Sequence, residues 1–314
     1  MIINGPASAN YDIDLGAMPI TDFYYLSMYD ESQIAMLGNN PVPPNGLING
    51  TMVNPTQTAG AYNNVTLTPG KKHRLRLINT SVDNNWYVSL DMHTFQVIQS
   101  DFVAINNYNT TWLFIAIGQR YDVIIYANET ASNYWFRAET ETCGNVATEG
   151  NVSAIFNYDS VPIEDPDSTA WPGPTFSCED ESELVPYVAK SVPREDFTFT
   201  AQDTLPLNIS TIDGIQYWTV NGSSIDVTWG DPTLLYVKNG NTTFPTDLNV
   251  IKLPDANVVS NPTHRRAIVV YLAPKPTSRI EYRILTFLSG HSGLFKTSRE
   301  CPILCTSMAT ISTS

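Results

Sequence analysis

Short segments in which apolar and polar residues alternate dominate the first half of the chain. The alternation is clear in Arg74–Leu77, Leu113–Ile117 and Asp122–Ile125, and Tyr134–Phe136 is an aromatic segment bounded by polar residues. A period of two residues is that of half-buried β-strands. Only Asp30–Leu37 predicts a brief helix. The pattern therefore indicates an all-β fold.

The strand-like segments between residues 62 and 158 are separated by clusters of Gly, Asn, Asp and Pro. This spacing is typical of an antiparallel Greek-key β-sandwich and unlike that of alternating strands and helices. We therefore expect one complete sandwich domain over residues 1–160.

The character of the chain changes after this block. Residues 161–195 are rich in proline and acidic residues, which predicts a linker stiffened by proline and by charge repulsion. A second β-rich block follows over residues 196–255, and it is too short to form a comfortable sandwich alone. We interpret it as a partial second domain.

The last segment, residues 256–314, differs in charge from everything before it. Residues 261–314 hold seven Lys or Arg and two Asp or Glu, net +5, whereas residues 1–260 hold ten and twenty-nine, net -19. One interpretation is a sequence altered by a frameshift or an unspliced intron near Val258. The other is a basic, partly disordered tail.

The composition of the whole chain excludes some partners. With 314 residues, a formal net charge of -14 and a pI near 4.5, the protein is a poor partner for nucleic acid. No apolar run reaches the ~18 residues that a membrane-spanning helix needs. We expect a soluble acidic protein with no nucleic-acid or membrane partner.

Two features indicate a secreted protein. Nine Asn-x-Ser/Thr sequons are candidate N-glycosylation sites, and they begin at Asn49, Asn64, Asn79, Asn109, Asn128, Asn151, Asn208, Asn221 and Asn241. Four cysteines permit disulfides, with Cys143–Cys178 the favoured pair and Cys301–Cys305 a poorer one. The first residues have no signal-peptide pattern, so we expect that the start of the protein is missing.

A set of short strings stands out at residues 4–12, 15–16, 22–25, 47–51, 66–71, 73–81, 118–123, 220–223, 226–230 and 241–245. Together these strings resemble fungal, ascomycete-type laccases of the multicopper oxidase family, and the match covers roughly residues 2–255. Residues 4–25 resemble the junction between the first and second cupredoxin domains, and the next strings resemble the body of the second. The strings after residue 219 resemble the first part of the third cupredoxin domain. The resemblance thus implies a cupredoxin-like fold.

The resemblance also implies a reaction, in which phenols lose single electrons at a type 1 copper and dioxygen is reduced to water at a trinuclear copper cluster. The family's copper ligands lie in His-x-His, His-rich and His-Cys-His motifs, and imidazole and thiolate suit copper. This chain has four histidines and no His-x-His motif. We therefore expect no copper in this chain and no activity alone. A missing first domain would pack against it.

The four histidines lie in different sequence contexts. His264 lies about where a family ligand string should begin, but Arg265 and Arg266 follow it, so copper binding is not expected. His73 is expected to be partly exposed or at a domain interface, and His93 to lie in a turn before a strand. His291 lacks the context of a nucleophile loop.

Asp101 is the candidate substrate-binding residue. The resemblance aligns it with a second-domain carboxylate that accepts a hydrogen bond from the phenol, which becomes strongly acidic once it loses an electron.

Two alternatives to an inactive laccase fragment remain open. One is a secreted, non-catalytic sandwich that binds a partner or glycan through Trp112, Trp135, Trp171, Trp218 and Trp229. The other is a piece of a split gene that works once its missing parts are restored.

Overall fold

The computed structural model describes residues 5, 7–140, 143–148, 152–174, 178, 179, 181–189, 207–220, 224, 230–241, 243, 244, 250, 251, 269 and 270. These residues fall into two compact units. Residues up to 28 together with 42–189 form the first unit. Residues 29–41 and those from 207 onward form the second.

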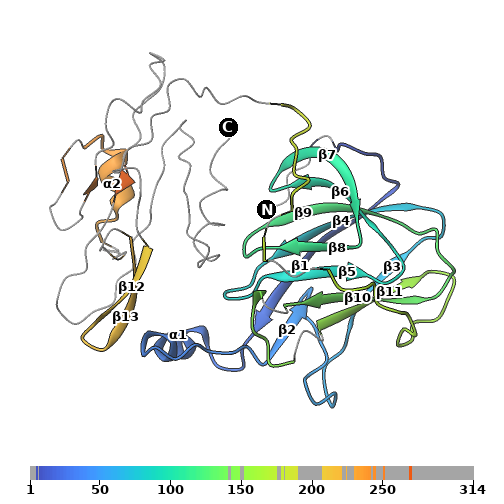
Figure 1. Cartoon of the computed structure of the whole chain (residues 1–314), viewed down its shortest axis with the longest axis horizontal. Coiled ribbons are helices and arrows are strands. Elements are labelled where there is room, and N and C mark those ends of the chain that lie inside the picture. Colours follow the sequence, from blue (N-terminus) through green and yellow to red (C-terminus); the bar gives the residue numbers. More distant parts are fainter. Residues whose placement is uncertain are drawn as a thin grey trace. The chain divides into compact units, whose positions relative to one another are not determined.

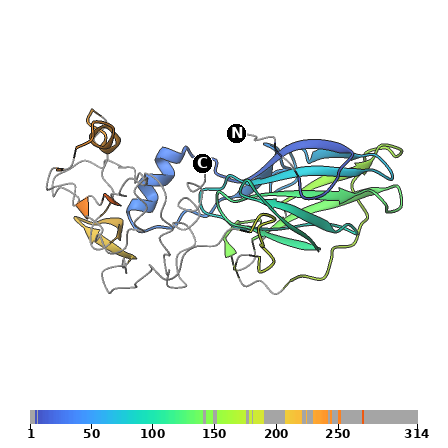
Figure 2. The ribbon, with the colours of Figure 1, turned by 90° about the horizontal axis from the view of Figure 1, so that it is seen from above.

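The first unit is a sandwich of two β-sheets (Figure 1, Figure 2). Its strands are β1 (Ile13–Phe23), β2 (Asn45–Ile48), β3 (Asn63–Leu67), β4 (Lys72–Asn79), β5 (Trp86–Leu90), β6 (Phe95–Ser100), β7 (Val103–Thr110), β8 (Trp112–Ile115), β9 (Arg120–Tyr126), β10 (Asn133–Glu139) and β11 (Val152–Tyr158). The six-stranded sheet has the order β2-β1-β4-β9-β6-β7, and the five-stranded sheet has the order β3-β11-β10-β5-β8. The predicted all-β sandwich is confirmed.

Most neighbouring strands are antiparallel, but two pairs are not. β1 pairs with β4 and β3 pairs with β11 in parallel register. The sandwich is therefore antiparallel except at these two pairs. Both parallel pairs join strands that are not neighbours in the chain, which leaves room for the crossover that parallel pairing requires.

One apolar core lies between the two sheets. It contains Leu75 and Leu77 from β4, Val123 and Ile125 from β9, and Phe136 from β10 facing them from the other sheet, all at most 2% exposed. These are the apolar positions of the alternating pattern, so the periodicity of the sequence correctly identified the inward face.

The outer face of the six-stranded sheet is also covered, by the N-terminal segment. Ser8 donates to the carbonyl of Ile98 at 2.9 Å, and Tyr11 lies under the guanidinium of Arg74 at 5.3 Å from the ring centroid. Arg74 pairs in turn with Asp122, to which its Nε donates at 2.9 Å. This coverage buries Arg74 to 2% exposure, although its position in the pattern predicts a solvent-facing side chain.

A second apolar cluster lies on the outer face of the five-stranded sheet. Tyr87, Trp112 and Phe114 pack there against Cys143 and Trp171. Trp171 belongs to the segment after β11, and we refer to the described residues of 161–189 as the strap. Because the strap covers this face, all five residues of β5 are buried.

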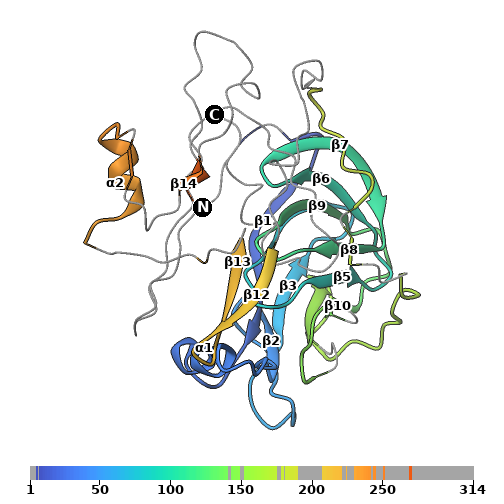
Figure 3. The same ribbon diagram turned by 60° about the vertical axis from the view of Figure 1, so that its left-hand side comes forward.

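The strap also reaches the six-stranded sheet, as Figure 3 shows for its last residues beside β7. The amide of Asn106 donates to the carbonyl of Val185 at 2.8 Å, and the amide of Tyr187 donates to that of Ala104 at 2.8 Å. The strap is therefore anchored to the edge strands of both sheets. This described part of the predicted linker packs on the sandwich and does not extend away from it.

The second unit contains short elements only. They are α1 (Met28–Met36), the hairpin β12 (Leu207–Ile212) with β13 (Ile215–Val220), α2 (Thr233–Lys238), and the two-residue pair β14 (Val250–Ile251) and β15 (Val269–Val270). The predicted brief helix is confirmed as α1, whereas α2 was not predicted. Among the described residues, no helix is long and apolar enough to cross a membrane.

Candidate functional site

Asp101 lies in the turn between β6 and β7, where its backbone adopts a left-handed conformation with φ of 42°. Its Oδ1 accepts a hydrogen bond from the amide of Arg120 at 2.9 Å, and its own amide donates to the Arg120 carbonyl at 3.0 Å. The next residue, Phe102, has φ of 71° and lies under the Arg120 guanidinium. One carboxylate oxygen of Asp101 thus holds this turn together.

Asp83 is a second carboxylate of interest, and sequence reasoning did not single it out. It is partly buried in the loop between β4 and β5, and burial, followed by the nearby Asp22, raises its pKa. A raised pKa makes a carboxylate a better proton acceptor near neutral pH.

The loop that carries Asp83 is held by buried polar groups. The Asp22 carboxylate accepts hydrogen bonds from the amides of Val82 at 3.0 Å and Asp83 at 2.8 Å, and from Nδ2 of Asn84 at 3.2 Å. Asp22 lies in β1, about 60 residues before the loop. No local sequence signal could reveal this pairing, because it depends on the fold that brings β1 beside β4.

His93 is buried at the start of the turn that leads into β6, in agreement with its predicted place. Its Nδ1 lies 2.9 Å from the carbonyl oxygen of Asp91, and its Nε2 lies 3.0 Å from the hydroxyl of Tyr158, which also accepts from the amide of Glu129. The carbonyl can only accept, so Nδ1 carries the proton and Nε2 accepts from Tyr158. Burial lowers the pKa of His93, which keeps the ring neutral.

His73 is fully buried in β4, which corrects the expectation of a partly exposed imidazole. Its Nε2 accepts a hydrogen bond from the amide of Thr68 at 3.0 Å, and burial lowers its pKa. The backbone of Thr68, which precedes β4, thus lies within hydrogen-bond distance of the ring. His73 is therefore a structural residue.

The described residues do not fit a copper site. His93 has both ring nitrogens engaged, and Nε2 of His73 accepts from the backbone. No group of three or more His, Cys, Asp or Glu residues that could hold a metal ion occurs in the part of the chain that the structure describes. His264, His291, Cys301 and Cys305 lie outside the described residues.

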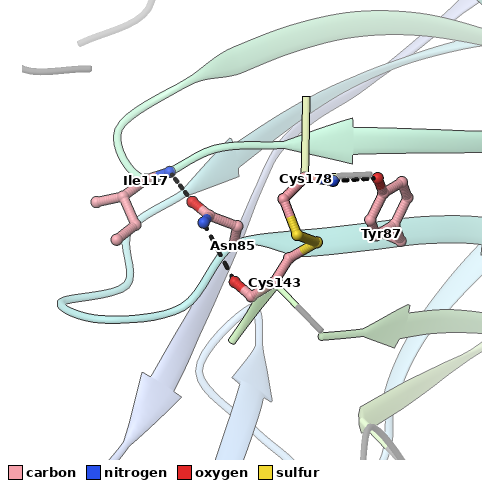
Figure 4. The surroundings of a disulfide bond; sticks show 5 residues. All are labelled: Asn85, Tyr87, Ile117, Cys143 and Cys178. Atoms are coloured by element: carbon pink, nitrogen blue, oxygen red, sulfur yellow. Dashed lines mark hydrogen bonds between the residues drawn. A yellow bond between two sulfur atoms is a disulfide. The ribbon is translucent and has the colours of Figure 1, made fainter. Parts of the chain in front are cut away.

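The predicted disulfide between Cys143 and Cys178 is present, with a Cα to Cα distance of 5.3 Å (Figure 4). Tyr87 on β5 accepts a hydrogen bond from the amide of Cys178 at 3.2 Å, and Asn85 Nδ2 donates to the carbonyl of Cys143 at 3.2 Å. Asn85 also accepts from the amide of Ile117 at 3.0 Å. The bridge therefore fixes the strap directly over the second apolar cluster.

The candidate glycosylation sites differ in accessibility. The exposed ones are Asn49, Asn64, Asn109, Asn128, Asn208 and Asn241. Asn151 and Asn221 lie outside the described residues. Asn79 is 1% exposed and donates both amide hydrogens, to the carbonyls of Asn84 at 2.9 Å and Ile115 at 3.0 Å. A glycan at Asn79 does not fit the fold, because its nitrogen is engaged inside the sandwich.

The tryptophans proposed to bind a partner serve the fold in the first unit. Trp112 donates to the carbonyl of Pro172 at 2.9 Å, and Trp171 donates to the carbonyls of Leu90 at 2.9 Å and His93 at 3.1 Å. Trp135 packs edge-to-face against Tyr62. In the second unit Trp218 is 47% exposed, and Trp229 lies outside the described residues.

Comparisons with known proteins agree with this fold. Residues 17–161 match the sequence model of the multicopper oxidase family. Laccase-3 of Botryotinia fuckeliana is 45% identical over 263 residues, which is 82% of this chain and 58% of the relative. Laccase-1 of Melanocarpus albomyces is 43% identical over 80% of this chain and 41% of the relative. The chain therefore spans about half the length of the curated relatives it matches.

The crystal structure of the laccase from Botrytis aclada superimposes on this chain with a TM-score of 0.72 and 37% sequence identity, covering 81% of this chain and 48% of that one. The structure of Fet3p, a multicopper oxidase that functions in iron import, shares the fold at 18% identity with a TM-score of 0.56. The residues that match the family model contain β2 to β11 and most of β1, and this chain accordingly belongs to the multicopper oxidase family.

Proposed function

We propose that this chain supplies the second cupredoxin domain, residues 1–160, and the start of the third, residues 196–255, of a laccase-type multicopper oxidase. The complete enzyme would oxidise phenolic substrates one electron at a time and reduce dioxygen to water. The observation that carries the proposal is the 37% identity and TM-score of 0.72 to a laccase over 81% of the chain, which accounts for 48% of that laccase. A first domain would pack against this chain.

The 314 residues alone are proposed to bind no copper and to turn over no substrate. His73 and His93 are used by the fold, and the sequence contains no His-x-His motif. Copper sites in proteins need several imidazole or thiolate ligands that converge on one point. The experiment is copper analysis of the purified chain together with an optical search for the thiolate-to-copper band. Stoichiometric copper with oxygen consumption would contradict the proposal.

Asp101 is proposed as the carboxylate that accepts the hydrogen bond of the phenol. Asp83 is a second candidate, and a specific observation favours it. Its pKa is raised, whereas an oxygen of Asp101 is engaged in holding its turn. A phenol that loses an electron must also lose its proton, and a partly buried carboxylate with a raised pKa suits that transfer.

The test uses a reconstituted enzyme in which the missing domains of a laccase relative are joined to this chain. The variants are Asp101→Asn and Asp83→Asn, and exposed Asp167→Asn is the matched control. Replacement of the true acceptor by asparagine should slow oxidation of a phenol by roughly 10²-fold or more, in line with general-base catalysis. The same replacement should leave oxidation of a non-phenolic donor unchanged. Equal losses with both donors would discard the residue concerned.

We further infer that the protein is made in a secretory pathway. Six described sequons present an exposed asparagine, and the Cys143–Cys178 bridge is the kind of disulfide that persists in oxidising compartments. Mass spectrometry of the protein from its natural source would detect the bridge and glycans at the exposed sequons. A reduced pair and unmodified asparagines would overturn this inference. Binding to a glycan array without metal would instead favour the non-catalytic alternative.

A further inference from the structure

The four outer edges of the sandwich are protected in different ways, and one of them is protected by no part of the described chain. The ends of the six-stranded sheet are β2 and β7, and the ends of the five-stranded sheet are β3 and β8. An outer strand presents unpaired backbone groups that can pair with another chain, so soluble proteins normally block such edges.

The strap blocks β7. Residues 185–187 lie along β7, where Asn106 donates to Val185 and Tyr187 donates to Ala104, each at 2.8 Å. Pro186 lies between Val185 and Tyr187 and forms an isolated antiparallel β-bridge with Ile105. Proline has no backbone N–H to donate, so the strap does not itself present a regular new edge.

The strap also blocks β8. The amide of Phe114 in β8 donates to Oε1 of Glu181 at 3.0 Å, and the hydroxyl of Tyr108 donates to Oε2 of the same carboxylate at 3.3 Å. Glu181 thus occupies the position that a backbone carbonyl of a neighbouring strand would take. A carboxylate at a sheet edge also repels pairing with an acidic second copy.

β2 is blocked by its own residues and by the turn that follows it. The amide of Gly46 donates to Oδ1 of Asn45 at 2.9 Å, and the amide of Ile48 donates to the carbonyl of Thr51 at 3.1 Å. These local bonds occupy two donors of a strand that is only four residues long. A short edge strand with satisfied donors is a poor template for pairing.

β3 lacks any comparable block. It pairs with β11, from Asn63 opposite Ala154 to Leu67 opposite Tyr158. On its other side, the structure describes no backbone hydrogen bond from β3 to another segment within the residues it covers. The strand has five residues of alternating exposure and carries no charged side chain. It is therefore the most open of the four edges.

Asn64 is the second residue of β3, and it is exposed within the sequon Asn64-Val65-Thr66. We propose that an N-linked glycan on Asn64 guards the β3 edge against pairing with a second copy of this chain. An N-linked glycan is bulky and hydrophilic, so a branched sugar on the second residue of this five-residue strand hinders the approach of another backbone to its edge. The proposal rests on the secretory production inferred above.

Asn109 provides the matched comparison, since it lies on an edge strand that the strap already blocks. It is exposed on β7 and begins the sequon Asn109-Thr110-Thr111. Asn128 provides a second comparison, because it follows β9, an interior strand of the six-stranded sheet. Glycans at these two positions are not needed for edge protection.

The experiment uses the full 314-residue chain secreted from a glycosylating yeast with an added leader peptide. Peptide mapping by mass spectrometry first measures the occupancy of Asn64, and an unoccupied site overturns the proposal. Sedimentation velocity then compares the folded protein before and after endoglycosidase trimming, which needs no variant to fold. We expect trimming to strengthen self-association about tenfold or more, a change of about 1.4 kcal/mol.

Variants assign the effect to one edge. Asn64→Gln should self-associate as strongly as the trimmed protein and show intermolecular β-structure in its infrared spectrum, whereas Asn109→Gln and Asn128→Gln should behave like the parent. Equal association of all three variants, or no change upon trimming, would refute the proposal. Copper content and phenol oxidation are not read out, so the outcome is independent of whether the oxidase assignment holds.

Discussion

Arg137 in β10 and Asp91 in the turn after β5 form a two-point ion pair beneath the strap. Arg137 Nε donates to Asp91 Oδ1 and Nη2 donates to Oδ2, both at 2.9 Å. Asp91 is fully buried and also accepts from Oγ of Ser168 in the strap at 2.6 Å. The pair thus connects the five-stranded sheet with the segment that crosses it.

Replacing Arg137 with Met leaves the Asp91 carboxylate buried with one partner fewer. We expect the free energy of unfolding to fall by about 3 kcal/mol, since an uncompensated buried charge is costly. Urea denaturation of the isolated chain measures the change. The double variant Asp91→Asn with Arg137→Met should lose less than the sum of the two single changes, and strict additivity would argue against direct coupling of the pair.

Asn79→Ala should also destabilise the fold strongly. The change leaves two buried carbonyls, those of Asn84 and Ile115, and the amide of Ser81 without their partner. We expect a loss of about 3 kcal/mol, measured by urea denaturation of unglycosylated protein. Asn128→Ala, at an exposed sequon, is the control and should stay within about 0.5 kcal/mol of the parent. A mild effect at Asn79 would show that the site tolerates solvent or repacking.

The buried histidines predict a loss of stability in mild acid. The folded state lowers the pKa of His93 and His73 below the ordinary value of 6.5, so the unfolded chain takes up protons first as the pH falls. Their contribution is therefore complete above pH 6.5 and declines as the pH decreases below it. Asp14, whose pKa is lowered from 3.8, stabilises the fold above that pH and loses this contribution only in stronger acid.

Urea denaturation between pH 7.5 and 5 measures this effect. The effect of His93 is best measured in the Asp83→Asn variant. The raised pKa of Asp83 makes stability change with pH in the direction opposite to that of the histidines, and the substitution removes this effect. His93→Gln should reduce the pH dependence in that background. An unchanged slope would mean that His93 is not held neutral by the fold.

Removal of the disulfide should loosen the strap. Cys143→Ser with Cys178→Ser opens a loop with a sequence separation of 35 residues, and chain entropy predicts a loss of about 4 kcal/mol. Limited proteolysis should then cut within the strap before it cuts the strands. Protection equal to that of the parent would show that Ser168, Trp171 and Glu181 hold the strap without the bridge.

The amino-acid sequence predicted the strands, α1 and the disulfide, because these depend on local periodicity and on a small number of cysteines. It misjudged burial wherever a distant segment covers an outer face. The alternating pattern predicts that Arg74 faces solvent, but its side chain packs against Tyr11 and pairs with Asp122. The same limit applies to the candidate site, since the environment of Asp83 depends on Asp22 from another strand.

The strap has a consequence for where the first domain can be cut from the rest of the chain. Residues 161–189 have the composition of a tether, yet their described part lies within the first compact unit. A recombinant domain that ends at residue 160 would uncover Tyr87, Trp112 and Phe114 and would leave Cys143 without its disulfide partner.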